Sequence, residues 1–369
     1  MENVSGIVYS EGRFFEGFVE IDQGKITAIS EGKPSEKSKA EGLILPLLAD
    51  CHTHIGDTYL RGKIDLSLPL EKIVRPPDGI KHIMLAKSSD ENIQKSMGRA
   101  IDEMNKGGIG RFIDFREGGQ RGLMQARKAI ANHQYPLATI LSRPEKLDYS
   151  EKEIDRLLKD SDGIGVSSIS DWPYDELDRI AEQANSNGKI FAIHASEAVR
   201  EDIGKVLDLR PDFLIHMAKA TNDDLRACKD ENIPIVVCPR SNARFGIKLD
   251  ISRMIDSGVT VCLGTDNSMF DIISMTEELK VAFELQTNSR PLTAEEVFKL
   301  AIDNAEKVLN DKNFISIRPG NPCELMVVRA GKKYDPDNIL RAGGKCSIEY
   351  KKGGIESRGS ANWRKSRKF

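Results

Sequence analysis

Short apolar runs recur along most of this chain, and polar stretches with a helical pattern separate them. The first run ends in two histidines and reads Leu-Ile-Leu-Pro-Leu-Leu-Ala-Asp-Cys-His-Thr-His at residues 43–54. Its length is typical of a fully buried strand. Seven similar runs follow, at residues 111–115, 137–141, 163–169, 190–193, 213–215, 234–238 and 260–263. The pattern predicts eight buried strands.

Amphipathic helical patterns lie between most of these runs. Residues 90–106 have an apolar residue every three or four positions and are followed by two glycines, which predicts a helix that ends there. Residues 174–187 repeat this pattern, and Thr221 can cap a short helix that extends through Glu231. After the eighth strand, the sequence from Thr293 to Glu296 forms a capping box, and it opens a helix whose apolar face extends to Val308.

The alternation of strands and helices predicts an α/β protein built as a (β/α)8 TIM-like barrel. From the second strand onward, strand starts lie roughly two dozen residues apart, which is the period of a βα unit. An open doubly wound sheet is the alternative, but eight evenly spaced units favour the barrel. The interval at residues 55–89 is longer and rich in proline, and we expect it to act as a lid or a substrate wall.

The two ends of the chain return to strand-like patterns separated by glycines. Residues 1–42 are too short to form a domain alone, and residues 312–358 supply further strands. We therefore expect residues 1–42 and 312–358 to form a small β-sandwich domain, with residues 43–311 as the barrel. Residues 359–369 are basic, and we expect a solvated tail.

Composition narrows the classes of partner. The 54 basic and 57 acidic residues leave a net charge of −3, which does not favour nucleic acid or an anionic membrane as a partner. No apolar run is long enough to cross a bilayer, and the start of the chain has no signal-peptide pattern. The six cysteines form no Cys-x-x-Cys pair. We expect reduced cysteines, a cytoplasmic location and a small-molecule substrate, and homo-oligomerisation stays open.

Candidate chemistry collects at the carboxyl ends of the expected strands, where a barrel of this kind forms its active site. Of the six histidines, four lie at these ends, namely His52, His54, His194 and His216. Side chains two apart on a strand point the same way, so His52 and His54 can approach one ion together. Asp266 follows the eighth strand. Together these residues predict a metal site.

Imidazole and carboxylate ligands suit one divalent ion, best Zn²⁺, with Fe²⁺ and Mn²⁺ as alternatives. Such an ion lowers the pKa of a bound water to about 7. Asp266 can accept a proton from that water. Glu197 lies three residues after His194 and can carry a proton to a substrate nitrogen.

The chain resembles the amidohydrolase superfamily, within the branch of cytosine deaminase, guanine deaminase and the triazine-hydrolase-like enzymes. The matching segments span the barrel in the family's order, and they are Asp50-Cys-His-Thr-His54, His194-Ala-Ser-Glu197, His216, Cys238-Pro-Arg-Ser-Asn242 and Leu263-Gly-Thr-Asp-Asn267. Two features depart from the family: Asn267 replaces the commoner glycine, and the chain is shorter than most nucleobase deaminases.

This resemblance implies a role for each matching residue. His52, His54, His194 and Asp266 would bind one metal ion, His216 would orient the attacking water or the substrate, and Glu197 would shuttle protons. Binuclear relatives usually bridge two metals through a lysine after the fourth strand. Residues 163–172 contain no lysine, which favours a mononuclear site.

Polar residues after the other strands are candidates for substrate contact, namely Arg116, Arg143, Trp172, Arg240 and Asn242. The three arginines would suit a carboxylate or phosphate on the substrate, and Trp172 could stack on a ring.

The leading hypothesis is a metal-dependent aminohydrolase that deaminates an amino-substituted nitrogen heterocycle, nucleobase-like or nucleoside-like, by attack of a metal-activated hydroxide with release of ammonia. In this hypothesis Glu197, His216 and Asp266 are catalytic. Hydrolysis of a cyclic amide or amidine C–N bond by the same water is one alternative. A non-catalytic scaffold is another, although every expected ligand position is filled.

Overall fold

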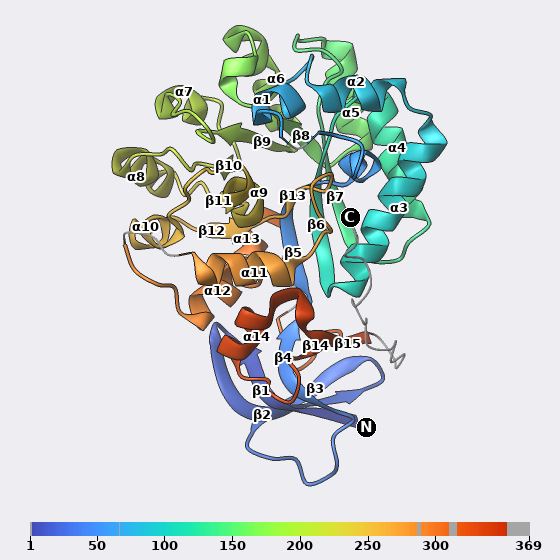
Figure 1. Ribbon diagram of the computed structural model, residues 1–369, viewed down its shortest axis with the longest axis vertical. Coiled ribbons are helices and arrows are strands. Elements are labelled where there is room, and N and C mark those ends of the chain that lie inside the picture. The colour runs from blue at the N-terminus through green and yellow to red at the C-terminus, as the bar shows by residue number, and fades with distance from the viewer. Residues whose placement is uncertain (1, 66, 286–288, 310–315, 353–369) are drawn as a thin grey trace.

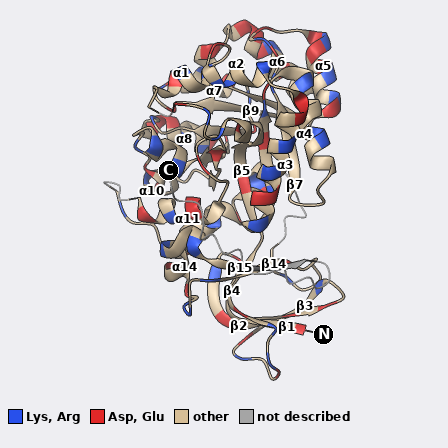
Figure 2. Ribbon diagram, turned by 45° about the vertical axis from the view of Figure 1, so that its right-hand side comes forward, with Lys and Arg blue, Asp and Glu red and all other residues tan. Residues whose placement is uncertain are grey.

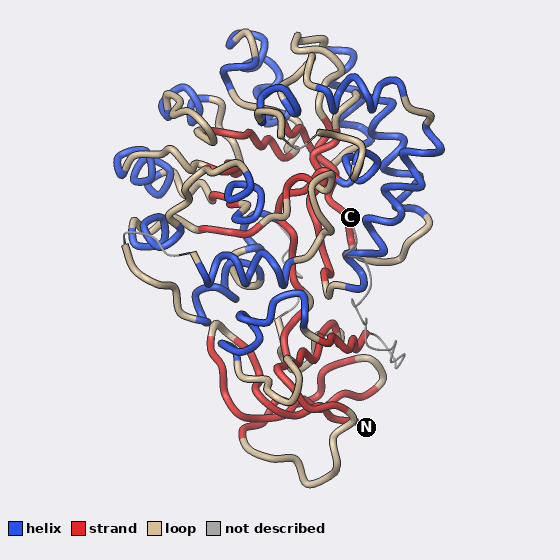
Figure 3. Tube along the Cα trace, viewed as in Figure 1, coloured by secondary structure: helices blue, strands red, loops and turns tan. Residues whose placement is uncertain are grey.

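Two β-sheets organise the computed structural model, which describes residues 2–65, 67–285, 289–309 and 316–352 (Figure 1). One sheet has nine strands and carries most of the helices, and the other has six strands and lies at the opposite end of the molecule. Figure 3 shows helices surrounding the nine-stranded sheet on its outside.

The nine-stranded sheet confirms the TIM-like α/β prediction. All of its neighbouring strands are parallel. Their order runs backwards along the chain to the first barrel strand, and a final two-residue strand lies beyond it at the other edge of the sheet. The strands are β5 (Leu48–His54), β6 (Ile109–Arg116), β7 (Leu137–Ser142), β8 (Gly163–Val166), β9 (Ile190–Ala195), β10 (Phe213–His216), β11 (Ile235–Val237), β12 (Val261–Leu263) and β13 (Asp266–Asn267).

The two edges of this sheet belong to one short stretch of chain. β12 pairs with β11, whereas β13 pairs with β5, and only Gly264 and Thr265 lie between β12 and β13. The eighth strand therefore contacts both the seventh and the first, and the sheet curls into a barrel. Closure of this kind leaves no long unpaired edge.

The predicted helices begin where their sequence signals indicate. The helix expected at residues 90–106 is α3 (Asp90–Lys106), and capping boxes at Thr221 and Thr293 open α8 and α12. The remaining barrel helices are α4 (Gly119–Ala131), α5 (Glu151–Asp160), α6 (Tyr174–Ser186), α7 (Ile203–Asp208), α8 (Asn222–Asp230), α9 (Pro239–Arg244), α10 (Ile251–Asp256), α11 (Met275–Glu284) and α12 (Ala294–Ala301). Charges of both signs are spread over these outer helices (Figure 2).

The helix expected to continue to Val308 is instead broken. α12 ends at Ala301, Ile302 leaves helical geometry, and a separate α13 (Ala305–Leu309) follows. Two polar side chains in the break bond elsewhere, because Asp303 accepts from Tyr9 and Asn304 donates to the carbonyl of Val261 at 2.8 Å. These tertiary contacts outweigh the helical pattern.

The six-stranded sheet combines both ends of the chain. Its order is β15-β14-β4-β1-β2-β3, where the strands are β1 (Glu2–Ser10), β2 (Arg13–Asp22), β3 (Lys25–Glu31), β4 (Ala40–Pro46), β14 (Glu324–Arg329) and β15 (Ser347–Lys352). Helix α14 (Pro336–Ala342) and a short turn, η3 (Gly343–Lys345), connect its last two strands. A second sheet facing it, as a sandwich requires, does not occur among the described residues. The basic tail at 359–369 lies outside the described residues.

The first predicted strand, at residues 43–54, divides between the two sheets. β4 lies in the six-stranded sheet and β5 in the barrel, and the chain passes from one sheet to the other near Leu47. Pro46 ends β4 because proline has no N–H to donate. The next two backbone amides then donate in different directions. The amide of Leu47 donates to the carbonyl of Glu324, in the six-stranded sheet, and the amide of Leu48 donates to the carbonyl of Gly108, just before β6. Continuous burial on both sides of this crossing made the run look like one strand.

The long interval at residues 55–89 contains three short helical elements, η1 (Ile55–Leu60), α1 (Leu70–Val74) and α2 (Ile80–Lys87). The strand expected at residues 163–169 ends earlier, at Val166, and a helical turn, η2 (Ile169–Asp171), follows it. In the part of the chain that the structure describes, no helix combines the length and the apolar character needed to cross a bilayer.

We predict that Gly264→Ala destabilises the protein by about 1–3 kcal/mol, because an added methyl would overpack the barrel closure. A Cβ at Gly264 would lie 2.8 Å from both the backbone nitrogen and the backbone oxygen of His52. The measurement is the free energy of unfolding in urea. Gly98→Ala is the control, since its Cβ would meet only the His133 ring, at 3.6 Å, and it should stabilise α3 slightly. Equal stability of Gly264→Ala and wild type would contradict the argument.

Candidate active site

His52 and His54 bring two imidazoles to the carboxyl end of β5. The Nε2 atoms of His52 and His54 lie 3.3 Å and 3.6 Å from the same carboxylate oxygen, Oδ1 of Asp266. Both side chains are buried, and they point the same way because they are two residues apart on a strand. The structure therefore brings together the two histidines of the first strand and the aspartate of the last.

His194, at the end of β9, completes a group of three imidazoles. Its Nε2 lies 3.2 Å from Nε2 of His52, and its Nδ1 lies 2.7 Å from the carbonyl of Val166. The carbonyl accepts a hydrogen bond, so Nδ1 carries the hydrogen, and the lone pair of Nε2 is on the side of His52. This is the tautomer that binds a metal ion through Nε2.

These donors fit a divalent ion. The ligand atoms of His52, His54 and Asp266 lie within 4.8 Å of one another, and so do those of His52, His194 and His216. Nitrogen and carboxylate donors suit Zn²⁺, Fe²⁺ or Mn²⁺. Burial lowers the pKa of His52 to about 3 despite the opposing effect of Asp266, so His52 is neutral at pH 7, as a metal ligand must be.

The strand ends that carry these residues have unusual backbone geometry. His216 has φ of 74° and Asp266 has φ of 57°, both in the left-handed region that costs a non-glycine residue free energy. The surrounding barrel holds them there. Asp50 is one restraint, because its carboxylate accepts from the amide of Thr265 at 2.9 Å and from the Thr265 hydroxyl at 2.6 Å. Strain at these positions is consistent with a functional site.

Asp266 is buried and Glu197 is half-buried, with its side chain 23% exposed, and the two carboxyl groups have opposite tendencies to bind a proton. Burial alone would raise the pKa of Asp266, but the neighbouring histidines outweigh it and hold that pKa well below its usual range. The Ser241 hydroxyl also donates to Asp266 Oδ2 at 2.5 Å. Burial raises the pKa of Glu197, and His216 opposes this only in part. Environments that separate two carboxyl groups in this way are typical of acid–base chemistry.

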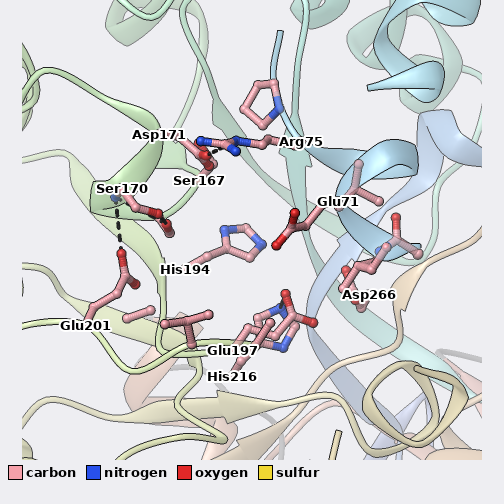
Figure 4. A pocket seen from close by; sticks show the side chains of 18 of the residues that line it. Glu71, Arg75, Ser167, Ser170, Asp171, His194, Glu197, Glu201, His216 and Asp266 are labelled. Atoms are coloured by element: carbon pink, nitrogen blue, oxygen red, sulfur yellow. Dashed lines mark hydrogen bonds and ion pairs between the residues drawn. The ribbon is translucent and has the colours of Figure 1, made fainter. Parts of the chain in front are cut away.

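A cavity of about 340 Å³ opens onto this group. His194, Glu197, His216 and Asp266 lie together along it (Figure 4). Leu70, Glu71 and Val74 of helix α1 line the cavity. Arg75, which follows the helix, lines it too, and its Nε lies 3.3 Å from Oδ1 of Asp171. The Glu71 carboxylate points toward the His194 ring (Figure 4). Part of the long interval therefore does form a wall of the cavity.

Of the five residues expected to contact substrate, only Arg143 is among the described residues that line this cavity. Arg116 is buried and pairs with Glu117 at 2.8 Å. Trp172 is buried and donates to Ser167 at 3.1 Å. Arg240 lines a separate hollow of about 50 Å³ and pairs with Asp271 at 2.7 Å, and Asn242 lies behind Glu197, to which it donates at 3.4 Å.

The physical reason for these four differences is local pairing. A polar residue at a strand end can point into the cavity or satisfy a buried partner, and the sequence does not distinguish the two. Asn242 keeps an indirect link, since it touches the candidate proton shuttle Glu197. Arg116, Trp172 and Arg240 have structural partners and lie outside the described lining of this cavity, so their direct contact with substrate stays a prediction.

Sequence reasoning missed Lys81 in α2. This lysine is buried and lines the cavity, and its ammonium lies 2.7 Å from Glu117 and 3.0 Å from Asp57. Lysines are mostly exposed, so a single lysine in a polar segment carries no signal of burial. Lysine and its two acidic partners are far apart in sequence and meet only in the fold.

Comparison with known proteins identifies relatives of this chain. A family model described as Amidohydrolase family matches residues 43–350. A putative aminohydrolase from Archaeoglobus fulgidus is 30% identical, over 92% of this chain and 97% of that protein. A 5-methylthioadenosine/S-adenosylhomocysteine deaminase from Caldicellulosiruptor saccharolyticus is 27% identical, over 87% of this chain and 82% of that protein.

A solved structure shares the fold at lower sequence identity. An adenosine deaminase from Xanthomonas campestris, crystallised with bound zinc, superposes with a TM-score of 0.75 at 17% identity. The match covers 95% of this chain and 91% of the other. This likeness supports the TIM-like barrel architecture.

We predict that zinc stabilises the protein and that His194→Ala abolishes most of this effect. At a free zinc concentration about 1,000 times the dissociation constant, binding should add about 4 kcal/mol to the free energy of unfolding. The measurement is unfolding with zinc and with a chelator. His133→Ala is the control, because His133 bonds to Ala129 at 2.8 Å away from the barrel ends. Full zinc-dependent stabilisation of His194→Ala would exclude it as a ligand.

Proposed function

The chain belongs to the amidohydrolase family, and from this premise we propose that it is a metal-dependent hydrolase that deaminates a nucleoside-like nitrogen heterocycle. The observation that carries the proposal is that His54, His194, Glu197 and Asp266 line one cavity, while Nε2 of His52 lies 3.3 Å from Asp266 and 3.2 Å from Nε2 of His194. Relatives named as deaminases support the removal of an amino group as the reaction.

We assign one divalent ion to His52, His54, His194 and Asp266. Three imidazoles and a carboxylate suit zinc, with iron or manganese as alternatives. When bound, the ion supplies Lewis acidity and lowers the pKa of a coordinated water to about 7. The absence of lysine from residues 163–172 supports a single ion, as in the family's mononuclear members.

The residues of the chain then move the protons of the reaction. Asp266 accepts a proton from the attacking water, whose oxygen forms a bond to the ring carbon that bears the amino group. Glu197, whose raised pKa favours its protonated form, donates a proton to the adjacent ring nitrogen. His216, 3.6 Å from Glu197, stabilises the charge that develops on the new oxygen. As the C–N bond breaks, the amino group takes up the proton held by Asp266 and leaves as ammonia, and the proton of the new hydroxyl returns to Glu197 as the carbonyl forms.

The cavity supports a substrate larger than a bare ring. Its volume of about 340 Å³ is within the range of small-molecule sites. Arg143 borders it, and its described side-chain hydrogen bond is a long one, 3.4 Å, to His82. A guanidinium in this position suits a carboxylate or phosphate group on the substrate.

We predict that Glu197→Gln lowers kcat by about 10²- to 10⁴-fold, because the amide cannot shuttle a proton. The measurement is ammonia release by zinc-loaded protein from a panel of aminopurines, aminopyrimidines and their nucleosides. Zinc content should not change. Glu201→Gln is the matched control: Glu201 also lines the cavity, but it accepts from the amides of Ser196 and Ser170.

Two outcomes would contradict this proposal. Near-normal activity of Glu197→Gln would remove Glu197 as the proton shuttle. A ring-opened product without ammonia would replace deamination by hydrolysis of a cyclic C–N bond.

We predict that Arg143→Met raises KM about 10- to 100-fold for a substrate with an anionic substituent, because it removes a charged hydrogen bond. The neutral analogue of that substrate should be nearly unaffected. The control is Arg200→Met, since Arg200 lines the cavity but is held by Asp224 through bonds of 2.8 Å and 2.7 Å. Equal effects on the anionic and neutral substrates would contradict this role.

A further inference from the structure

A cluster of charged side chains lies directly behind His54, on the side away from Asp266. Its members are Asp57, Lys81, Arg116 and Glu117, and each side chain is at most 6% exposed. They come from three different elements, since Asp57 lies in η1, Lys81 in α2, and Arg116 ends β6 just before Glu117. Burial of so many charges is costly unless they are paired, so their arrangement needs an explanation.

Glu117 connects the cluster to His54. Its Oε1 lies 3.0 Å from Nδ1 of His54, and the carbonyl of Phe115 lies 3.0 Å from the same nitrogen. Two acceptors face Nδ1, so this nitrogen carries the hydrogen. Nε2, on the side of Asp266, is then left with its lone pair, which is the form that can coordinate a metal ion.

Lys81 and Arg116 hold the Glu117 carboxylate in place. Lys81 donates to Oε1 at 2.7 Å, and Arg116 donates to Oε2 at 2.8 Å. Lys81 also donates to Asp57 at 3.0 Å, so one ammonium separates two buried carboxylates. Glu117 lines the cavity, but its two oxygens are already occupied by Lys81, Arg116 and His54. Glu117 differs in this respect from Glu197. Because both of its oxygens have partners, Glu117 is suited to support His54 rather than to contact a substrate.

We propose that Lys81 and Glu117 are a positioning pair that fixes the tautomer and orientation of His54 for metal binding. The inference rests on the proposed metal site and adds to it residues outside the ligand set. Because Lys81 belongs to α2, the pair also ties the metal site to the segment that roofs the cavity. Loss of α2 packing should therefore weaken metal binding, although no residue of α2 is a ligand.

The test measures zinc affinity by competition with a chelator, together with the absorption spectrum of the cobalt-substituted protein, which reports ligand geometry. Glu117→Gln should weaken zinc binding about 10- to 100-fold, the usual effect of removing a carboxylate that orients a ligating histidine. Lys81→Met should weaken it comparably, and Lys81→Arg should restore part of the loss. The double variant should lose less than the product of the two single losses, because both substitutions disrupt one pair.

Glu324→Gln is the matched control, because Glu324 is a buried carboxylate that pairs with Arg111 at 3.2 Å outside the cavity. It should lower thermal stability without changing zinc affinity or the cobalt spectrum. If Glu117→Gln does not fold, Glu117→Asp, which retracts the carboxylate, should weaken zinc binding instead. Wild-type zinc affinity and an unchanged cobalt spectrum in the Glu117 and Lys81 variants would overturn the proposal.

Zinc affinity tests this inference, whereas ammonia release tests the proposed function, so the two can fail separately. Weaker zinc binding in the variants, in a protein that releases no ammonia from any substrate, would support the pair while contradicting deamination. Ammonia release with zinc affinity unaffected by either substitution would support deamination and overturn the pair. A wild-type protein that binds no divalent ion would contradict both.

Discussion

At Gly264 the backbone of the last barrel strand passes so close to His52 that a side chain would not fit. Both the closure of the barrel and the geometry of the candidate site require this close approach. There the last strand crosses from β11 to β5, and the amide of Gly264 donates to Val237 while the amide of Thr265 donates to Asp50. Two residues later, Asp266 lies beside His52 and His54. Closure of the barrel and assembly of the candidate metal ligands are therefore parts of the same event.

Burial then determines what each ionisable group at the site can do. Asp50 and Glu278 are buried with few compensating charges, and burial raises their pKa values to about 7 and about 8. Asp266 is buried to the same degree, but its neighbouring histidines hold its pKa low. The same carboxyl chemistry thus favours the ionised form at Asp266 and the protonated form at Glu197, which suits the proton-acceptor and proton-donor roles proposed for them.

The segment between β5 and α3 serves two sides of the site. Helix α1 roofs the cavity, whereas Lys81 of α2 reaches behind His54 into the buried cluster. The same segment therefore lines the cavity and supports a candidate metal ligand. Because one segment lines the cavity and also supports His54, a shift of this segment would change both the shape of the cavity and the geometry of the site.

The residue pattern alone predicts the βα alternation, the helix caps and the histidines at strand ends. These depend on side-chain periodicity and on short-range hydrogen bonds, which neighbouring residues specify. In the structure, Nε2 of His52 lies 3.3 Å from Asp266 and 3.2 Å from Nε2 of His194, because parallel strands present their carboxyl ends on one side.

Other features of the fold and of the candidate site become visible only once the chain is folded. Three features depend on partners distant in sequence, namely the crossing of the chain at Leu47, the break after α12, and the pairing of Arg240 and Lys81. A buried charge and an exposed charge look alike in a sequence. The difference between them is the partner, and folding alone supplies it.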